Sequence, residues 1–298
     1  MAHSTKGRAM PVAEIGQFEI AYEVIGEGQP WVITPGGRFS KDFGGVREMA
    51  ERLASQGRMA IIWDRPNCGE SGVCFEGESE SVMQADALVA LLQHLDCGPT
   101  VLVGGSGGSR VSLLTAARHP DVAAGLGIWW ISGGVHGNMI LAGVYCFPSL
   151  RAIWNGTMED VATLPEWEEV VSRNPRNRDR FLAQDAGEFL STMERWAHAY
   201  CACGDPLVPG LSGNEARSLE VPILVFRSGE SDMFHTRATS ERLARELPNA
   251  RLVEPPWGDR EWIERGEMRA RGEGTIFSGW YQLVPQLSEW ADEAIRPS

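Results

Sequence analysis

Short apolar runs alternate with longer amphipathic stretches along both ends of the chain. Apolar runs of about four to eight residues are typical of buried strands, and apolar positions spaced three or four apart indicate helices. An alternation of the two predicts a mainly parallel sheet with helices on its faces. The predicted strands are residues 18–25, 31–34, 59–63, 100–104, 125–131, 223–226 and 251–253, and the predicted helices are 46–56, 79–95, 109–118 and 287–295.

The middle of the chain lacks this alternation. Between the strands at 125–131 and 223–226 lie about 90 residues without a convincing strand pattern. A helical insertion at this point covers the carboxyl edge of the sheet, where α/β folds bind ligands. We therefore predict a three-layer α/β sandwich with a mainly parallel sheet of about eight strands, a core of residues 11–131 and 216–298, and a helical cap of residues 132–215 with short helices at 150–154, 158–161, 167–171 and 189–200.

Charge and hydropathy narrow the class of partner. The 298 residues include 27 basic and 40 acidic side chains, a net charge of −13. Such a balance repels phosphates, so we expect neither nucleic acid nor an anionic membrane as a partner. The longest apolar run, near 123–131, is far shorter than the roughly 20 residues of a membrane helix. With no apolar leader segment visible, we expect a cytoplasmic protein that acts on a small molecule.

The cysteines do not predict a metal site. None of the six shows CxxC or CxxxH spacing, and Cys201 with Cys203 form a C-x-C pair that is more often incidental than ligating. We therefore expect neither a bound metal nor an organic cofactor.

The sharpest motif is a G-x-S-x-G segment at 104–108, between an apolar strand and a helix. In this context the turn is so tight that the serine backbone is strained, and Gly104 and Gly108 leave room for neighbouring chain. Ser106 is then exposed at the sheet edge, beside the free N–H groups of the helix that follows. The motif predicts a nucleophile; the alternatives are a phosphate-type turn or a plain tight loop.

Three further segments extend this pattern. Pro35-Gly36-Gly37 follows an early strand, residues 64–71 read D-R-P-N-C-G-E-S, and residues 229–232 read G-E-S-D. Together with the serine motif they resemble the capped α/β-hydrolases, a group that holds proline iminopeptidases, carboxylesterases and C–C bond hydrolases. The resemblance covers nearly the whole chain, although Asn67 stands where the D-x-R/P-G-x-G-x-S turn has its first glycine.

The resemblance implies a role for each matching position. Ser106 is the expected nucleophile and Asp232 the expected acid. The segment with Gly36 falls where the family carries its His-Gly-Gly oxyanion loop, so the main-chain N–H groups of Gly37 and Gly107 are expected to bind the oxyanion.

One position departs from the family. The base is ordinarily a histidine after the last strand, but Asp259 stands there, and no histidine occurs beyond residue 235. A serine hydroxyl without a base is a poor nucleophile. We favour His235, on the loop that follows the seventh strand, as a relocated base oriented by Asp232 or Asp259. This requires a Ser106–His235 contact of about 2.6–3.2 Å; otherwise His235 merely packs beside the acid.

Two other side chains are alternative bases. His136 follows the sixth strand and could overhang the site. Asp259 could accept the proton itself, because desolvation between Trp257 and Trp262 would raise its pKa. A salt bridge between Asp259 and an arginine is the simpler interpretation.

Several residues are candidates for substrate binding. Arg38 and Arg110 could bind a substrate carboxylate, or pair with local acids. Trp130 and Trp257 belong to a set of tryptophans that suggests an aromatic-walled pocket. The charged run at 174–180 is most simply a solvated cap surface.

These observations favour cofactor-independent hydrolysis of an ester, lactone or related acyl bond in a small hydrophobic or aromatic molecule. Two alternatives stay open. The same pocket could support C–C hydrolysis, lyase or decarboxylase chemistry, or cofactor-free oxygenation without an acyl-enzyme, or the chain could be a ligand-binding receptor without turnover. Exposed tryptophans on the cap could also form a homodimer interface.

Overall fold

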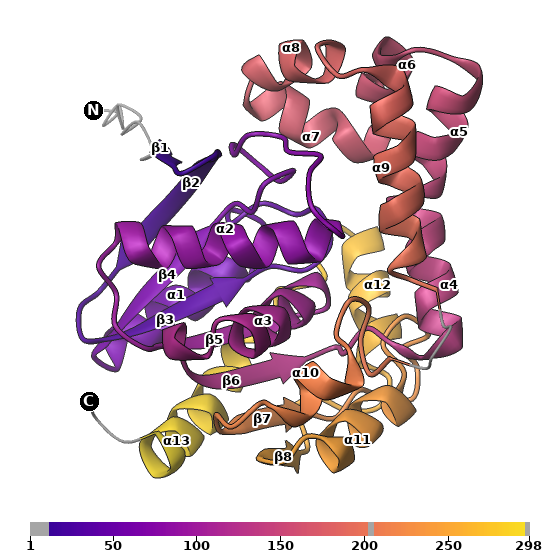
Figure 1. Ribbon diagram of the computed structural model, residues 1–298. Coiled ribbons are helices and arrows are strands. Elements are labelled where there is room, and N and C mark those ends of the chain that lie inside the picture. Colours follow the sequence, from indigo (N-terminus) through magenta and orange to yellow (C-terminus); the bar gives the residue numbers. More distant parts are fainter. Residues whose placement is uncertain (1–11, 202–205, 296–298) are drawn as a thin grey trace.

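The computed structural model describes residues 12–201 and 206–295, and its strands form one eight-stranded sheet (Figure 1). The order is β1-β2-β4-β3-β5-β6-β7-β8. Strands β1 and β2 pair antiparallel, as do β2 and β4, and the other pairs are parallel. The predicted fold class is confirmed. The strands are β1 (Val12–Ile15), β2 (Phe18–Ile25), β3 (Gln29–Thr34), β4 (Arg58–Trp63), β5 (Thr100–Gly105), β6 (Ala123–Trp129), β7 (Ile223–Phe226) and β8 (Ala250–Val253).

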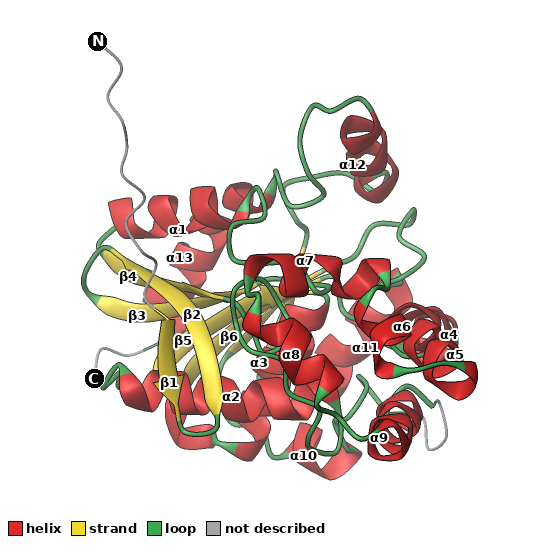
Figure 2. Ribbon diagram, turned by 90° about the horizontal axis from the view of Figure 1, so that it is seen from above, coloured by secondary structure: helices red, strands yellow, loops and turns green. Residues whose placement is uncertain are grey.

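Helices cover both faces of this sheet (Figure 2). Leu88 and Leu113 belong to the apolar cluster on one face, and Met49 and Leu287 belong to the cluster on the other. The sheet thus lies between two helical layers, as the sequence predicts. The first layer holds α2 (Glu80–His94), α3 (Gly107–Arg118) and α11 (Arg237–Glu246), and the second holds α1 (Val46–Ser55) and α13 (Val284–Ala294).

The register of the parallel strands brings distant segments to one edge. Thr34 pairs with Gly104, and Gly105 pairs with Trp129. Because the strands run in the same direction, the residues after β3, β5, β6 and β7 emerge side by side. The oxyanion loop, the serine turn and the loop with Asp232 therefore meet at the carboxyl edge of the sheet.

Helices α4 to α9 follow β6 in the segment for which the sequence predicts a cap (Figure 1). Their apolar centre is aromatic, with Trp167, Phe181, Phe189 and Trp196 all buried. Phe75, from the loop after β4, contacts all four rings at centroid distances of 5.0–6.1 Å. A side chain from the loop after β4 therefore helps to fill the centre of this helical segment. These helices are α4 (Gly134–Tyr145), α5 (Phe147–Asn155), α6 (Met158–Ala162), α7 (Pro165–Arg173), α8 (Arg176–Leu182) and α9 (Ala186–His198).

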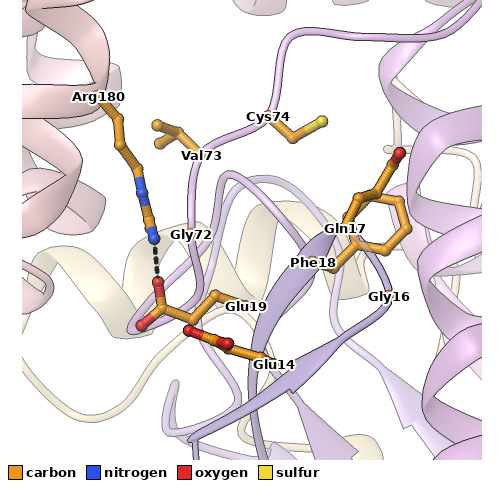
Figure 3. Close-up of a pocket in the computed structure, with 9 residues that line it drawn as sticks. All are labelled: Glu14, Gly16, Gln17, Phe18, Glu19, Gly72, Val73, Cys74 and Arg180. Atoms are coloured by element: carbon orange, nitrogen blue, oxygen red, sulfur yellow. Dashed lines mark ion pairs between the residues drawn. The ribbon is translucent and has the colours of Figure 1, made fainter.

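The charged run at 174–180 is solvated only in part: Arg176, Arg178 and Asp179 are exposed as expected, but Asn174 and Asn177 are buried. Asn177 is fully buried, donates to Ser71 O and accepts from the Val73 N–H. Arg180 of α8 reaches Glu19 of β2 at 2.5 Å, across a pocket of about 190 Å³ (Figure 3). Because Glu19 belongs to β2, this ion pair joins α8 to the sheet.

Four further helices complete the described residues: α10 (Gly213–Arg217), α12 (Glu261–Ala270) and the short 3-10 helices Pro120–Val122 and Trp280–Leu283. Within the described ranges, no helix combines the length and the apolar character that crossing a bilayer requires.

Candidate active site

Ser106 lies on a strained turn between β5 and α3. Its backbone has φ 57° and ψ −118°, a conformation that side-chain-bearing residues rarely adopt. A Cβ at Gly104 would lie 2.7 Å from Gly108 C, and a Cβ at Gly108 would overlap Thr34 O. The glycines are therefore needed for close passage of the chain. The turn presents Ser106 at the N-terminus of α3, as the motif predicts.

His235 joins Ser106 to Asp232. His235 Nε2 lies 2.8 Å from Ser106 Oγ, and His235 Nδ1 lies 2.9 Å from Asp232 Oδ2. An ionised carboxylate only accepts hydrogen bonds, so Nδ1 carries the proton and Nε2 is free to accept from the serine hydroxyl. Both His235 and Asp232 are 3 % exposed. The structure thus brings three of the predicted residues into a hydrogen-bonded chain.

Asp232 also fixes the loop on which His235 stands. Its Oδ1 accepts the main-chain N–H groups of Phe234 and His235, each at 2.9 Å. The acid therefore binds both the side chain and the backbone of the histidine three residues later. This local turn gives the imidazole its direction.

Aromatic rings hold the imidazole from two sides. Trp130 stacks on His235 at 6.0 Å between centroids and 14° between planes, and Trp262 meets its edge at 5.3 Å. The Trp130 indole N–H donates to buried Glu261 at 2.5 Å, and Arg265 pairs with the same carboxylate. Burial raises the pKa of Glu261, against the opposing influence of Arg265 and Trp130. Trp130 therefore orients the histidine, a role the sequence did not indicate.

The predicted oxyanion loop lies beside the serine turn. Gly37 has φ +55°, and a Cβ at Gly36 would lie 2.9 Å from the Ser106 Cβ, so the loop packs directly on Ser106. Arg65 donates to the carbonyl oxygens of Gly36 at 3.2 Å and Gly37 at 2.6 Å. These two hydrogen bonds fix the orientation of both carbonyl groups and of their peptide planes. A Cβ at Gly107 would lie 3.5 Å from Gly37 N, so the two glycines are neighbours.

Asp259 does not approach the serine, and the expected rise in its pKa is wrong. Its carboxylate pairs with Arg237 and lies 3.6 Å from Arg227. The side chain is about half exposed, and the Arg237 hydrogen bond lowers the pKa of Asp259. This is the arginine salt bridge that the sequence left as the alternative. Trp257 covers Arg265 at 4.6 Å, and Trp262 faces His235; neither desolvates Asp259.

His136 and Arg38 also lie in surroundings that differ from those expected. His136 is exposed on α4, and no contact with Ser106 is found among the described residues. Arg38 makes a two-pronged ion pair with Glu80 at 3.1 and 3.2 Å, and stacks over Trp167 at 3.8 Å. Its charge is matched by a local acid. The Arg38 interpretation as a carboxylate ligand is therefore not supported.

The described residues contain no group of three or more His, Cys, Asp or Glu side chains placed to hold a metal ion. Cys203 and its neighbours at 202–205 lie outside the described residues.

Known structures resemble this chain in fold. Est816, described as an N-acyl homoserine lactone degrading enzyme, is 20% identical with a TM-score of 0.58, over 96% of this chain and 100% of its own. A thermophilic esterase from Thermogutta terrifontis with malate bound is 20% identical with a TM-score of 0.56, over 96% and 98%. The enol-lactonase from Burkholderia xenovorans LB400 is 20% identical with a TM-score of 0.54, over 88% and 97%.

No curated protein sequence matches the chain significantly. A family model does match it, over residues 31–266, which span the sheet from β3 to β8, the serine turn and the cap segment. The chain belongs to the alpha/beta hydrolase family.

Proposed function

We propose that the protein is a serine hydrolase that cleaves an ester, lactone or related acyl bond of a small molecule. The observation that carries the proposal is the chain Ser106–His235–Asp232, with links of 2.8 and 2.9 Å. Both distances lie within the range of about 2.6–3.2 Å that proton transfer between such groups requires. The structural neighbours described as an esterase or as lactone-degrading enzymes agree with it.

The first half of the reaction acylates the serine. Ser106 Oγ attacks the substrate carbonyl carbon while His235 Nε2 takes its proton, and the Asp232 carboxylate stabilises the imidazolium that forms. The N–H groups of Gly37 and Gly107 and the N-terminus of α3 stabilise the negative charge on the carbonyl oxygen. His235 then gives its proton to the leaving oxygen, and an acyl-serine remains.

Water completes the cycle. His235, again neutral, takes a proton from a water molecule that attacks the acyl carbon, and then returns a proton to Ser106 Oγ. Every proton passes through one side chain, which explains why the imidazole is held on so many sides.

The sequence leaves open reactions without an acyl-enzyme, because Asp259 stands at the usual histidine position. His235 Nε2 lies 2.8 Å from Ser106 Oγ, so a base is available to the serine and acyl transfer is favoured. No observation favours the receptor alternative over turnover.

Intact-mass measurement after treatment with a fluorophosphonate tests the proposal. We expect one adduct on the wild-type protein, none on Ser106→Ala, and labelling slowed at least a hundredfold in His235→Ala. Asp259→Asn is the matched control, because its carboxylate sits in a half-exposed ion pair away from the serine, and it should label at the wild-type rate. An unlabelled wild-type protein would refute the proposal, and loss of labelling in Asp259→Asn with retention in His235→Ala would move the base to the carboxylate.

A further inference from the structure

Arg110 is a buried cation one helical turn beyond the nucleophile. It lies in the first turn of α3 and is 3 % exposed. Its guanidinium donates to Ser81 Oγ at 3.3 Å, Ser132 Oγ at 2.7 Å and Tyr200 OH at 3.3 Å. Ser132 follows β6 and Tyr200 follows the last cap helix, so the guanidinium lies where the core meets the cap.

The three hydrogen-bond partners of Arg110 are neutral hydroxyls, and its guanidinium also lies over the rings of Tyr145 and Tyr200 at 5.9 and 5.5 Å. No carboxylate among residues 12–201 and 206–295 pairs with it, whereas three other buried cations have an acid. Arg38 pairs with Glu80, Lys41 with Asp64, and Arg265 with Glu261. Buried Arg65 also has no acid within those ranges, but it donates to two main-chain carbonyls. A buried charge without a counter-charge is costly, and such groups ordinarily receive a partner. The positive charge of Arg110 is therefore left for a group outside the described protein residues.

The hydroxyls point to the nature of that group. Each of their oxygens accepts a hydrogen bond from Arg110, and no acceptor for their own protons is found within the described ranges. Burial also raises the pKa of Tyr200, which keeps its phenol protonated as a donor. One guanidinium and three O–H donors form a set that matches the acceptor oxygens of a carboxylate.

The guanidinium is close to the reacting centre. A Cβ at Gly107 would lie 3.2 Å from Arg65 Nη1, 3.5 Å from Gly37 N and 3.7 Å from Arg110 Nη2. Arg110 therefore lies on the same side of Gly107 as the oxyanion N–H group. Arg65 donates to the main-chain carbonyls of Gly36 and Gly37 and to Gln84. The hydrogen-bond partners of Arg110 are instead side-chain hydroxyls, which can also donate to a ligand.

We propose that Arg110, with the hydroxyls of Ser132 and Tyr200, binds a carboxylate of the substrate, a few bonds from the acyl group that Ser106 attacks. This inference rests on the proposed hydrolase function and narrows it to carboxylate-bearing esters or lactones. The overall charge of −13 repels such molecules at long range, so the buried guanidinium supplies the attraction only inside the site.

Matched ester pairs test the substrate class. The 4-nitrophenyl half-esters of glutarate, adipate and pimelate are each compared with the neutral compound that keeps the 4-nitrophenyl ester and carries a methyl ester in place of the free carboxylate. Spontaneous hydrolysis is subtracted from each rate. We expect wild type to favour the acid of at least one pair, and Arg110→Gln to lower that kcat/KM ratio about tenfold to hundredfold, the effect of losing a charge-assisted hydrogen bond. The ratio is taken on one preparation, so a partly folded variant does not mimic the effect.

Two variants sharpen the comparison. Arg110→Lys keeps the charge and should keep part of the ratio. Arg118→Gln removes an arginine from the same helix whose partners are Glu78 and Glu215 at the surface, and should keep the wild-type ratio.

Calorimetric titration of adipate into Ser106→Ala, at constant ionic strength, measures the anion site without turnover. Binding that weakens at least tenfold in Ser106→Ala/Arg110→Gln supports the inference even if fluorophosphonate fails to label the wild-type protein, in which case the hydrolase proposal alone falls. A labelled, active protein whose acid-to-diester ratio and adipate binding are both unchanged by Arg110→Gln overturns the inference and leaves the hydrolase proposal standing.

Discussion

Glycine in place of Ser106 measures the strain in the nucleophile turn. At φ 57° and ψ −118°, a residue with a Cβ carries about 1–3 kcal/mol of backbone strain that glycine does not. Ser106→Ala and Ser106→Gly both lose the 2.8 Å hydrogen bond to His235, so that loss cancels between them. What remains is the strain, offset by the greater chain entropy of glycine in the unfolded state and by the loss of one buried methyl group.

A second pair of variants, Ser112→Ala and Ser112→Gly, cancels the contributions of glycine entropy and of the lost methyl group. Ser112 is a fully buried residue of α3 with helical backbone, where glycine is less favourable than alanine by about 1 kcal/mol. At each position, the free energy of unfolding of the alanine variant is subtracted from that of the glycine variant. This difference should be about 1–3 kcal/mol more positive at 106 than at 112.

Equilibrium unfolding in urea, followed by circular dichroism, gives the four free energies. The comparison is valid where the four proteins share one dependence of free energy on urea concentration. If the glycine-minus-alanine difference is equal at the two positions, the turn is not strained and the reasoning from its backbone angles is refuted.

Three shorter predictions concern other parts of the molecule. Asp232→Asn should lower kcat for ester hydrolysis by about 10⁴-fold, because an amide does not hold the required imidazole tautomer; an effect below tenfold in steady-state assays would argue against its role. Gly108→Ala should unfold at a lower urea concentration, since the added methyl group overlaps Thr34 O, and wild-type stability would contradict the packing. Burial raises the pKa of the Cys68 and Cys146 thiols to about 12, so peptide mapping after iodoacetamide treatment at pH 8 should find both unmodified in the native protein and modified in urea, whereas rapid native alkylation would be incompatible with their burial.

The sequence predicts those features whose cause is local or follows from strand order. The serine turn is encoded within five residues, Gly104 to Gly108, by the need for small side chains in a tight passage. The proximity of His235 to Ser106 follows from topology, because parallel strands deliver their following loops to one edge. Neither inference requires a knowledge of side-chain packing.

The remaining features depend on contacts between distant segments. The run at 174–180 looks solvated until Glu19 is brought beside Arg180. Helix α4 shows no apolar periodicity, because its residues are apolar on nearly every side, and β1 is an edge strand of four residues with one buried side chain. The partners of Arg110 are also set by distant segments, because Tyr200, 90 residues further along the chain, provides a hydroxyl to its guanidinium. Such facts are properties of the assembled fold and leave no local pattern to detect.

The placement of acid and base on one loop changes how many parts of the molecule must be aligned. When the two residues come from separate loops, folding must position both independently against the serine. Here Asp232 holds His235 through a turn of three residues, so the pair moves as one unit with a single alignment to Ser106. The loop after β8 therefore supplies no group to the proton transfer, and side-chain substitutions at 255–260 should be accepted more freely than in a protein whose histidine occupies that position. Its backbone still supports the catalytic loop, because Asp259 O accepts the Ser231 N–H at 3.0 Å.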